Sequence, residues 1–394
     1  MRLVEINAAR NCGSTGRIAE AIGLEAVADG WECLMVHGPR YVNPSRLPSV
    51  VTQGVWGDRW HGVRSLLLDG HGLGSARATR RLVAQLEQWQ PDVVHLHNIH
   101  GYYLNYPVLF EWLQRSQCRV VWTLHDCWTF TGHCTHFDYC GCGKWRTECH
   151  DCPQRSAYPR SLADHSLRNY RLKKQLFTSL GSRLTIVTVS HWLEGLVRES
   201  FFKDTAVRTI YNGIDISAFR PRDVKPARSY VLGVASPWTQ RKGLDDFIAL
   251  RQYLPADYGI VLVGLTPKQI KALPQGITGI ERTQNVDQLA ELYSEATLFA
   301  NPTYEDNFPT TNLEAMACGT PVVTYRTGGS PEAITPTTGF VVDKGDIRAI
   351  ADAALKVKEQ GKQTYSAACR HRAEQCFNKA DRFAEYVRLY NNLL

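Results

Sequence analysis

Two series of alternating strand-like and helix-like segments run through this sequence of 394 residues. In the first series, the apolar runs at residues 2–8 and 93–98 have the character of strands, and the segments at residues 16–30 and 75–89 have the character of helices. Strands that alternate with helices in this way are typical of βαβ units, whose strands form a parallel sheet. The pattern therefore predicts an α/β fold.

A second series of the same kind contains the strand-like runs YVLGVAS, GIVLVGL, TLFANP and PVVTY. The polar stretch at residues 222–229 separates the two series and is predicted to be a linker. A chain of 394 residues also exceeds what one hydrophobic core usually serves. We therefore predict two Rossmann-like domains that face a cleft, at residues 1–221 and 222–377, followed by a C-terminal helix at residues 378–394.

The composition is that of an ordinary globular protein, with 44% hydrophobic and 21% charged residues. No run of about 18 apolar residues is present, so no membrane-spanning helix is predicted. The N-terminal residues MRLVEINAA have the character of a strand and not of a signal peptide, which predicts a cytoplasmic protein. The net charge of +7 suits anionic sugar nucleotides, a membrane surface or nucleic acid, and does not choose among them.

Two acidic residues, Asp306 and Glu314, lie eight positions apart in the segment YEDNFPTTNLEAMACGTPVVTYRTGGSPEAI. Residues 310–318 have helix-forming character, and Gly319 is a stop signal. The pattern places one carboxylate at a helix N-terminus and the other about two turns along the helix. Backbone N–H groups of residues 307–311 would then be able to bind an anion. A sugar nucleotide, which is polyhydroxylated and carries phosphate, suits this arrangement.

The same segment resembles the signature of the retaining glycosyltransferases of family 4, in which a Glu, seven residues and a second Glu precede an A-M-A-x-G-x-P-V-V run. The match extends from Leu313 to Val323, and Asp306 occupies the position of the first Glu. The resemblance implies a GT-B fold, in which the C-terminal helix crosses back to the first domain. It also implies that Glu314 accepts hydrogen bonds from the ribose of a donor and that Asp306 contacts the donor sugar.

Further donor-side positions are implied by this resemblance. Lys242 would bind the diphosphate, and Arg241 is the nearest second cation because Pro237 stands where the family usually has an Arg. Such cations can neutralise a leaving diphosphate without a metal ion, so no catalytic metal is expected. Backbone groups at Val286 would meet the nucleobase, which leaves uridine and guanosine open. The other implied donor-binding residues are Gly264, Asn307, Phe308, Pro309 and Thr310.

Two features of the first domain complete the implied site. The family places a Gly-rich loop like NCGSTGR, residues 11–17, beside the donor diphosphate and the acceptor, which implicates Gly13 and Gly16. His125 ends the strand-like run VVWTLHD and resembles the histidine that contacts the donor sugar. From the residues alone, the glycines could equally close a β–α turn, and His125 could be satisfied by local backbone groups. His95 and His97 lie on one face of their strand and are assigned a structural role.

Six of the 12 cysteines fall within a predicted insertion at residues 127–153. Outside a secretory context, such clustering favours a metal or reduced thiols over a disulfide framework. Four thiolates suit a tetrahedral structural zinc, and Cys140 is left over. The ligands favoured by the resemblance, whose subfamily includes members with a comparable insertion, are Cys134, Cys142, Cys149 and Cys152. The alternative is a set of reduced or disulfide-linked thiols that stabilise a loop.

These features predict a retaining glycosyltransferase that moves a sugar from a nucleoside-diphosphate sugar to a saccharide or lipid-linked saccharide acceptor in cell-surface polysaccharide biosynthesis. The resemblance is to colanic-acid and exopolysaccharide enzymes, which implies peripheral contact with the inner membrane surface. A sugar-nucleotide epimerase or a phosphorylase on the same fold is an alternative. A zinc-dependent nucleic-acid-binding protein is another, but the cysteine cluster has no adjoining run of Lys or Arg, so no nucleic-acid partner is expected.

Overall fold

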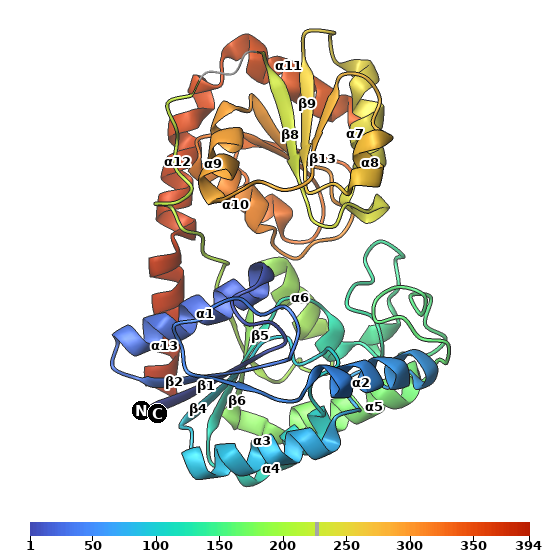
Figure 1. Cartoon of the computed structure of the whole chain (residues 1–394), viewed down its shortest axis with the longest axis vertical. Coiled ribbons are helices and arrows are strands. Elements are labelled where there is room, and N and C mark those ends of the chain that lie inside the picture. The colour runs from blue at the N-terminus through green and yellow to red at the C-terminus, as the bar shows by residue number, and fades with distance from the viewer. Residues whose placement is uncertain (225–227) are drawn as a thin grey trace. The chain divides into compact units, whose positions relative to one another are not determined.

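The computed structural model describes residues 1–224 and 228–394, which form two compact units (Figure 1). Residues 225–227, in the middle of the predicted linker, lie outside the described residues. Unit 1 comprises Met1–Ile210 and Phe383–Leu394, and unit 2 comprises Tyr211–Arg382.

The segment at residues 211–221 packs in unit 2, although the sequence pattern assigned it to the first domain. The backbone N–H of Ile214 donates to the carbonyl oxygen of Phe377 at 2.8 Å. The ring of Tyr211 stacks on that of Phe308, with 4.8 Å between the ring centroids. These contacts are made with residues distant in sequence, so the local polarity of the chain could not indicate the boundary.

Unit 1 contains a seven-stranded sheet in the order β3-β2-β1-β4-β5-β6-β7, in which all neighbours are parallel. Its strands are β1 (Arg2–Asn7), β2 (Glu32–His37), β3 (Ser49–Val51), β4 (Val93–Leu96), β5 (Arg119–Leu124), β6 (Leu184–Thr188) and β7 (Ala206–Thr209). Its main helices are α1 (Gly13–Ala28), α2 (Val55–Leu68), α3 (Ala76–Trp89), α4 (Tyr106–Arg115), α5 (Ser166–Phe177) and α6 (His191–Glu199). The strand order reverses between β1 and β4, and open α/β sheets bind ligands beyond the carboxyl ends of the strands at such a point.

Unit 2 contains a six-stranded parallel sheet in the order β10-β9-β8-β11-β12-β13. Its strands are β8 (Tyr230–Val234), β9 (Gly259–Val263), β10 (Ile277–Ile280), β11 (Leu298–Asn301), β12 (Val322–Tyr325) and β13 (Gly339–Val342). Its helices are α7 (Leu244–Leu250), α8 (Pro267–Lys271), α9 (Val286–Glu295), α10 (Thr310–Ala317), α11 (Ile347–Gln360) and α12 (Gln363–Phe377). The two parallel sheets with their helices confirm the predicted α/β fold class (Figure 1). Among the described residues, no helix has both the length and the apolar character needed to cross a bilayer.

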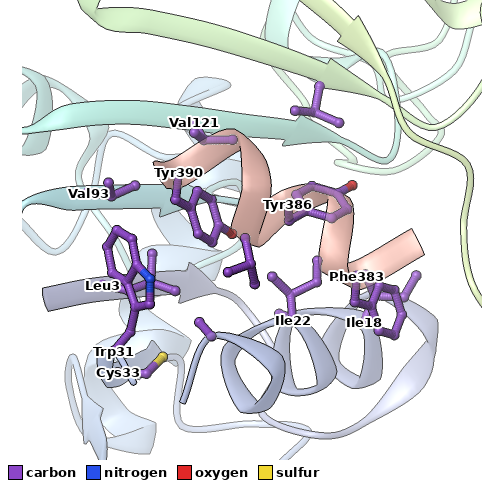
Figure 2. Packing of buried hydrophobic residues seen from close by; sticks show 14 of the residues in the cluster. Leu3, Ile18, Ile22, Trp31, Cys33, Val93, Val121, Phe383, Tyr386 and Tyr390 are labelled. Carbon is purple, nitrogen blue, oxygen red and sulfur yellow. The ribbon is translucent and has the colours of Figure 1, made fainter. Parts of the chain in front are cut away.

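The C-terminal helix α13 (Lys379–Leu393) packs in the core of unit 1 from Phe383 onward. Figure 2 shows Phe383, Tyr386 and Tyr390 on this helix among buried side chains of β1, β4, β5 and α1. The rings of Trp31 and Tyr390 meet edge to face, with their centroids 5.7 Å apart. Each buried aromatic side chain contributes about 1.5–3 kcal/mol, so this helix is a substantial part of the core. The helix returns to unit 1 as the resemblance implied.

Candidate active site

Lys242 and Asp306, the residues implicated in binding the diphosphate and the sugar of a donor, form an ion pair in unit 2. Lys242 Nζ donates to Asp306 Oδ2 at 2.6 Å, and the two side chains are 26% and 22% exposed. Lys242 follows β8 and Asp306 follows β11, which are neighbours in the sheet. Their shared place at the carboxyl ends of parallel strands explains why residues 64 positions apart meet.

Arg241 forms a second ion pair in the same two loops. Its Nη1 lies 3.6 Å from Oε2 of Glu305, whose side chain is only 5% exposed. The backbone N–H of Tyr304 donates to the carbonyl oxygen of Arg241 at 2.9 Å and ties the loops together. The sequence analysis assigned no role to Glu305, although its place directly before Asp306 was a signal for one.

Gly328 allows the loop after β12 to approach the Asp306 loop closely. Its φ is +53°, and a Cβ atom at this position would lie 1.7 Å from the carbonyl oxygen of Asp306. The backbone N–H of Gly329 donates to the carbonyl oxygen of Asn307 at 2.9 Å. Only glycine fits at residue 328, so the Gly-Gly pair of the signature supports the backbone that carries Asp306.

Glu314 is the fifth residue of α10, just over one turn from its start and not the two turns that were predicted. The hydroxyl of Tyr293 donates to Glu314 Oε2 at 3.1 Å. Burial, together with the negative charge of Glu314, raises the pKa of Tyr293 well above its ordinary value. Tyr293 therefore remains a hydrogen-bond donor that orients the carboxylate. Its position within a regular helical pattern gave no signal of this role.

The residues directly before α10 are buried. Phe308 is 3% exposed, and its carbonyl oxygen accepts a hydrogen bond from Asn212 Nδ2 at 3.0 Å. Asn307 is likewise buried. Pro309 precedes the helix and Thr310 is its first residue.

Gly264 and Val286 also follow carboxyl ends of strands in unit 2. Gly264 follows β9, and a Cβ atom there would lie 1.8 Å from the carbonyl oxygen of Ala235 in the loop after β8. Val286 is the first residue of α9, and the side chain of Asn285 caps this helix by accepting from the Gln288 N–H at 2.8 Å. The implied base-reading turn is thus a helix N-terminus.

In unit 1, the predicted glycine loop is shorter than expected. Gly13 begins α1, and Gly16 lies in the first turn of that helix. Gly13 has a φ of +66°, and a Cβ atom at Gly16 would lie 3.2 Å from the carbonyl oxygen of Ala9. Both glycines therefore permit a tight passage from β1 into α1 at the point where the strand order reverses.

His125 is connected to a buried carboxylate through His97. The distance between His97 Nδ1 and His125 Nε2 is 3.1 Å, and His97 Nε2 lies 2.7 Å from Glu5 Oε2. Glu5 is fully buried in β1, directly opposite His95 in the register of β1 with β4. His95 Nδ1 lies 3.1 Å from the other carboxylate oxygen of Glu5. Sequence reasoning missed Glu5, although a carboxylate inside an apolar strand was a signal for it.

The protonation states in this network fix the tautomer of His125. Burial opposes ionisation of Glu5, but the charges and hydrogen bonds of His95 and His97 outweigh it and lower its pKa to about 2. Burial, assisted by His95, lowers the pKa of His97 to about 4, and burial also lowers the pKa of His125. At neutral pH, His97 donates from Nε2 to the Glu5 anion and accepts at Nδ1. His125 therefore donates from Nε2 and carries its lone pair on Nδ1.

Glu5, His95 and His97 bring three potential metal-ligand atoms within 4.8 Å of one another. Other protein groups already bond His95: its Nδ1 lies 2.6 Å from the Tyr390 hydroxyl, and its Nε2 lies 2.8 Å from Thr123 Oγ1. These bonds account for the cluster as a hydrogen-bonded network.

The four cysteines predicted to bind zinc line one cavity of about 20 Å³. They are Cys134, Cys142, Cys149 and Cys152. Cys140 is exposed, and its thiol donates to the carbonyl oxygen of Phe137 at 3.3 Å. The four cysteines that were predicted as ligands therefore line one cavity, and Cys140 lies outside it.

Comparison with known families identifies the chain as a glycosyltransferase. Residues 17–218 match the family described as Glycosyltransferase Family 4, and residues 228–360 match the family described as Glycosyl transferases group 1. The chain belongs to Glycosyltransferase Family 4 and has the GT-B fold. Family membership favours a glycosyltransferase over the epimerase, phosphorylase and nucleic-acid-binding alternatives.

The chain is also similar to named relatives, and solved structures share its fold. The chain is 25% identical over 320 residues, 77% of each protein, to WcaC of Escherichia coli (strain K12), provisionally named a colanic acid biosynthesis glycosyl transferase. Sucrose-phosphate synthase from Thermosynechococcus elongatus has a TM-score of 0.72 at 18% identity, covering 100% of this chain and 98% of that one. HepE from Anabaena, in complex with UDP-glucose, has a TM-score of 0.66 at 16% identity, covering 100% of both chains.

Proposed function

We propose that the protein is a retaining glycosyltransferase that transfers a sugar from a nucleoside-diphosphate sugar to a saccharide or lipid-linked saccharide acceptor in cell-surface polysaccharide biosynthesis. The observation that carries the proposal is the 2.6 Å ion pair between Lys242 and Asp306. It holds a cation suited to a diphosphate and a carboxylate suited to sugar hydroxyls at one edge of the sheet.

In the proposed reaction, the donor diphosphate replaces Asp306 as the partner of Lys242. The released Asp306 carboxylate then accepts hydrogen bonds from the sugar. The bond between C1 of the sugar and the diphosphate oxygen breaks, and the acceptor oxygen bonds to C1 on the same face. The acceptor's proton passes to the leaving diphosphate. Lys242 and Arg241 stabilise the negative charge that develops there, and the products are a nucleoside diphosphate and a glycoside of retained configuration.

Relatives suggest the donors and acceptors to test first. The HepE complex contains UDP-glucose, and a relative from Corynebacterium glutamicum is named as a GDP-mannose-dependent mannosyltransferase. The descriptions of WcaC and WaaG refer to colanic acid and lipopolysaccharide biosynthesis, which supports a saccharide acceptor from a cell-surface polymer.

The proposal is tested by nucleotide binding and by product analysis. UDP or GDP should raise the melting temperature of the wild-type protein, and Lys242→Ala should remove that increase. Lys271→Ala, which changes a lysine of α8, is the matched control and should retain the increase. Transfer should release one nucleoside diphosphate per glycoside formed. A product of inverted configuration would contradict retention, and nucleotide turnover without a glycoside would contradict transfer.

The helix α2 supports a further part of the proposal, peripheral contact with an anionic membrane surface on the cytoplasmic side. Trp56, Trp60, Val63 and Leu67 follow one another at helical spacing and are 71%, 73%, 45% and 51% exposed. We call these four side chains the α2 stripe. The exposed charges of the helix are Arg59 and Arg64, whereas its one carboxylate, Asp58, is buried and paired with Arg40. Tryptophan favours the membrane–water interface, and arginine favours anionic headgroups.

Vesicle flotation tests this membrane contact. The wild-type protein should float with vesicles containing phosphatidylglycerol and should bind phosphatidylcholine vesicles less. The double variant Trp56→Ser, Trp60→Ser should lose flotation while keeping activity on a water-soluble acceptor. Tyr253→Ser, which changes an aromatic residue of unit 2 that is 44% exposed, is the control and should float like the wild type. Unchanged flotation of the double variant would contradict the role of the α2 stripe.

A further inference from the structure

His133 lies between the cysteine cavity and a buried carboxylate. Its Nδ1 is 2.5 Å from Asp69 Oδ1, and the two side chains are 1% and 2% exposed. Its Nε2 is buried and has no hydrogen-bond partner, and the residue lines the same cavity as the cysteines. Buried polar atoms nearly always have a partner, so an acceptor nitrogen in this position points to a missing ligand.

Three of the cysteines around this cavity are connected by hydrogen bonds to one another or to nearby backbone. The thiols of Cys134 and Cys152 share a hydrogen bond. The backbone N–H of Gly132 donates to Cys149 Sγ at 3.2 Å. A Cβ atom at Gly132 would lie 2.8 Å from Cys149 Cβ and 2.2 Å from the carbonyl oxygen of Ser166, so glycine is needed where the insertion passes α5. The cavity volume of about 20 Å³ suits a single ion or water and nothing larger.

We infer that the insertion binds a structural Zn²⁺ ion through the thiolates of Cys134, Cys149 and Cys152 and through Nε2 of His133. Three Cys and one His form a common ligand set of structural zinc sites. Asp69 accepts the hydrogen of His133 Nδ1, which is the usual support of a zinc-bound histidine. Cys142, which was predicted to be one of the four ligands, also lines the cavity but is not among the inferred ligands.

Zinc binding requires the cavity to contract. In a tetrahedral site with Zn–S bonds of about 2.3 Å, neighbouring ligand atoms lie within about 4 Å of one another. Among the residues that the structure describes, Glu5, His95 and His97 bring three potential ligand atoms within 4.8 Å of one another. No three ligand atoms of the inferred zinc set lie that close together. Residues 127–153 contain two short 3₁₀ turns, Trp128–Phe130 and Lys144–Arg146, and no α-helix or strand. No α-helix or strand within residues 127–153 fixes the spacing of the inferred ligands.

The inferred ion would connect three parts of unit 1. Asp69 follows α2, the cysteines belong to the insertion, and Gly132 contacts Cys149 beside the start of α5. The insertion begins two residues after His125. The zinc would therefore hold the segment that leaves the carboxyl end of β5, a structural role separate from glycosyl transfer.

Metal analysis of the purified full-length protein tests this inference. The wild type should contain one zinc per chain, and His133→Asn and Cys152→Ser should each lose it. Cys140→Ser is the matched control, and both it and Cys142→Ser should retain the ion. A chelator should lower the melting temperature of the wild type and should not change that of Cys152→Ser.

Alkylation of the wild-type protein gives a second measurement that needs no folded variant. With zinc bound, mass spectrometry should find Cys149 and Cys152 protected and Cys140 and Cys142 modified. Zinc that is lost in Cys142→Ser but kept in His133→Asn would overturn the histidine as a ligand. Wild-type protein without zinc, or with cysteines that react only after reduction, would overturn the site.

Discussion

Replacing Glu5 by Gln should change both stability and activity, because Glu5 sets the proton positions that reach His125. Glu5 is fully buried, and His97 donates to its Oε2 at 2.7 Å. Glutamine has nearly the same shape but removes the charge and places an NH₂ group opposite one histidine. If that group faces His97, the proton of His97 moves to Nδ1 and that of His125 moves to Nδ1 as well.

The expected magnitude follows from the bonds lost. A hydrogen bond to a buried charged group contributes about 1.5–3 kcal/mol, so the free energy of unfolding should fall by about that amount. The inverted tautomer of His125 would lose one hydrogen bond to the donor sugar. A loss of about 1.4 kcal/mol corresponds to about a tenfold decrease in kcat/KM.

Urea unfolding, kcat/KM and ¹⁵N-histidine NMR together form the assay. Tyr390→Phe is the matched control, since it removes a hydroxyl 2.6 Å from His95 Nδ1 and leaves the contact between His97 and His125 in place. It should lower stability by about 1 kcal/mol and leave kcat/KM near the wild-type value. Wild-type kcat/KM in Glu5→Gln, with the proton of His125 found on Nδ1, would refute the reasoning.

Three further outcomes are expected. Lys242→Ala and Glu314→Ala should each lower kcat/KM for donor turnover by about 100-fold without unfolding the protein, because each removes a charged group from the donor site; activity near wild type in a folded variant would remove that residue from the site. Phe383→Ala should lower the free energy of unfolding by about 3–4 kcal/mol in urea, because the side chain is 4% exposed in the core of unit 1. Burial lowers the pKa of His61 and of His97 from 6.5 to about 4, so the unfolded chain binds protons first as the pH falls. Each histidine should therefore cost about 3 kcal/mol of stability between pH 7 and pH 4, and equal urea midpoints at the two pH values would contradict this.

The sequence predicted those parts of the fold and site that depend on local pattern. The apolar runs at residues 2–8 and 93–98 are β1 and β4, and the signature around Glu314 contains a helix close to its predicted bounds. What could not be predicted depends on register and distant packing. Glu5 meets His97 only because β1 and β4 pair in parallel with Glu5 opposite His95.

Dependence on distant packing also explains why two other contacts could not be predicted from the sequence. The Lys242–Asp306 contact depends on β8 and β11 being neighbours, which chain order does not reveal. The unpartnered nitrogen of His133 becomes visible only when Asp69, 64 residues earlier, is seen to occupy its other nitrogen. In each case the chemical group was present in the sequence, and its partner was set by the fold.

The configuration of the product tests the central claim most directly. Proton NMR can follow the purified protein with α-linked UDP- and GDP-sugars and a lipid-linked saccharide acceptor. We predict a new glycoside with the anomeric configuration of the donor and an equal amount of nucleoside diphosphate. An inverted glycoside, or no glycoside from any donor while the nucleotide still binds at Lys242, would contradict the account.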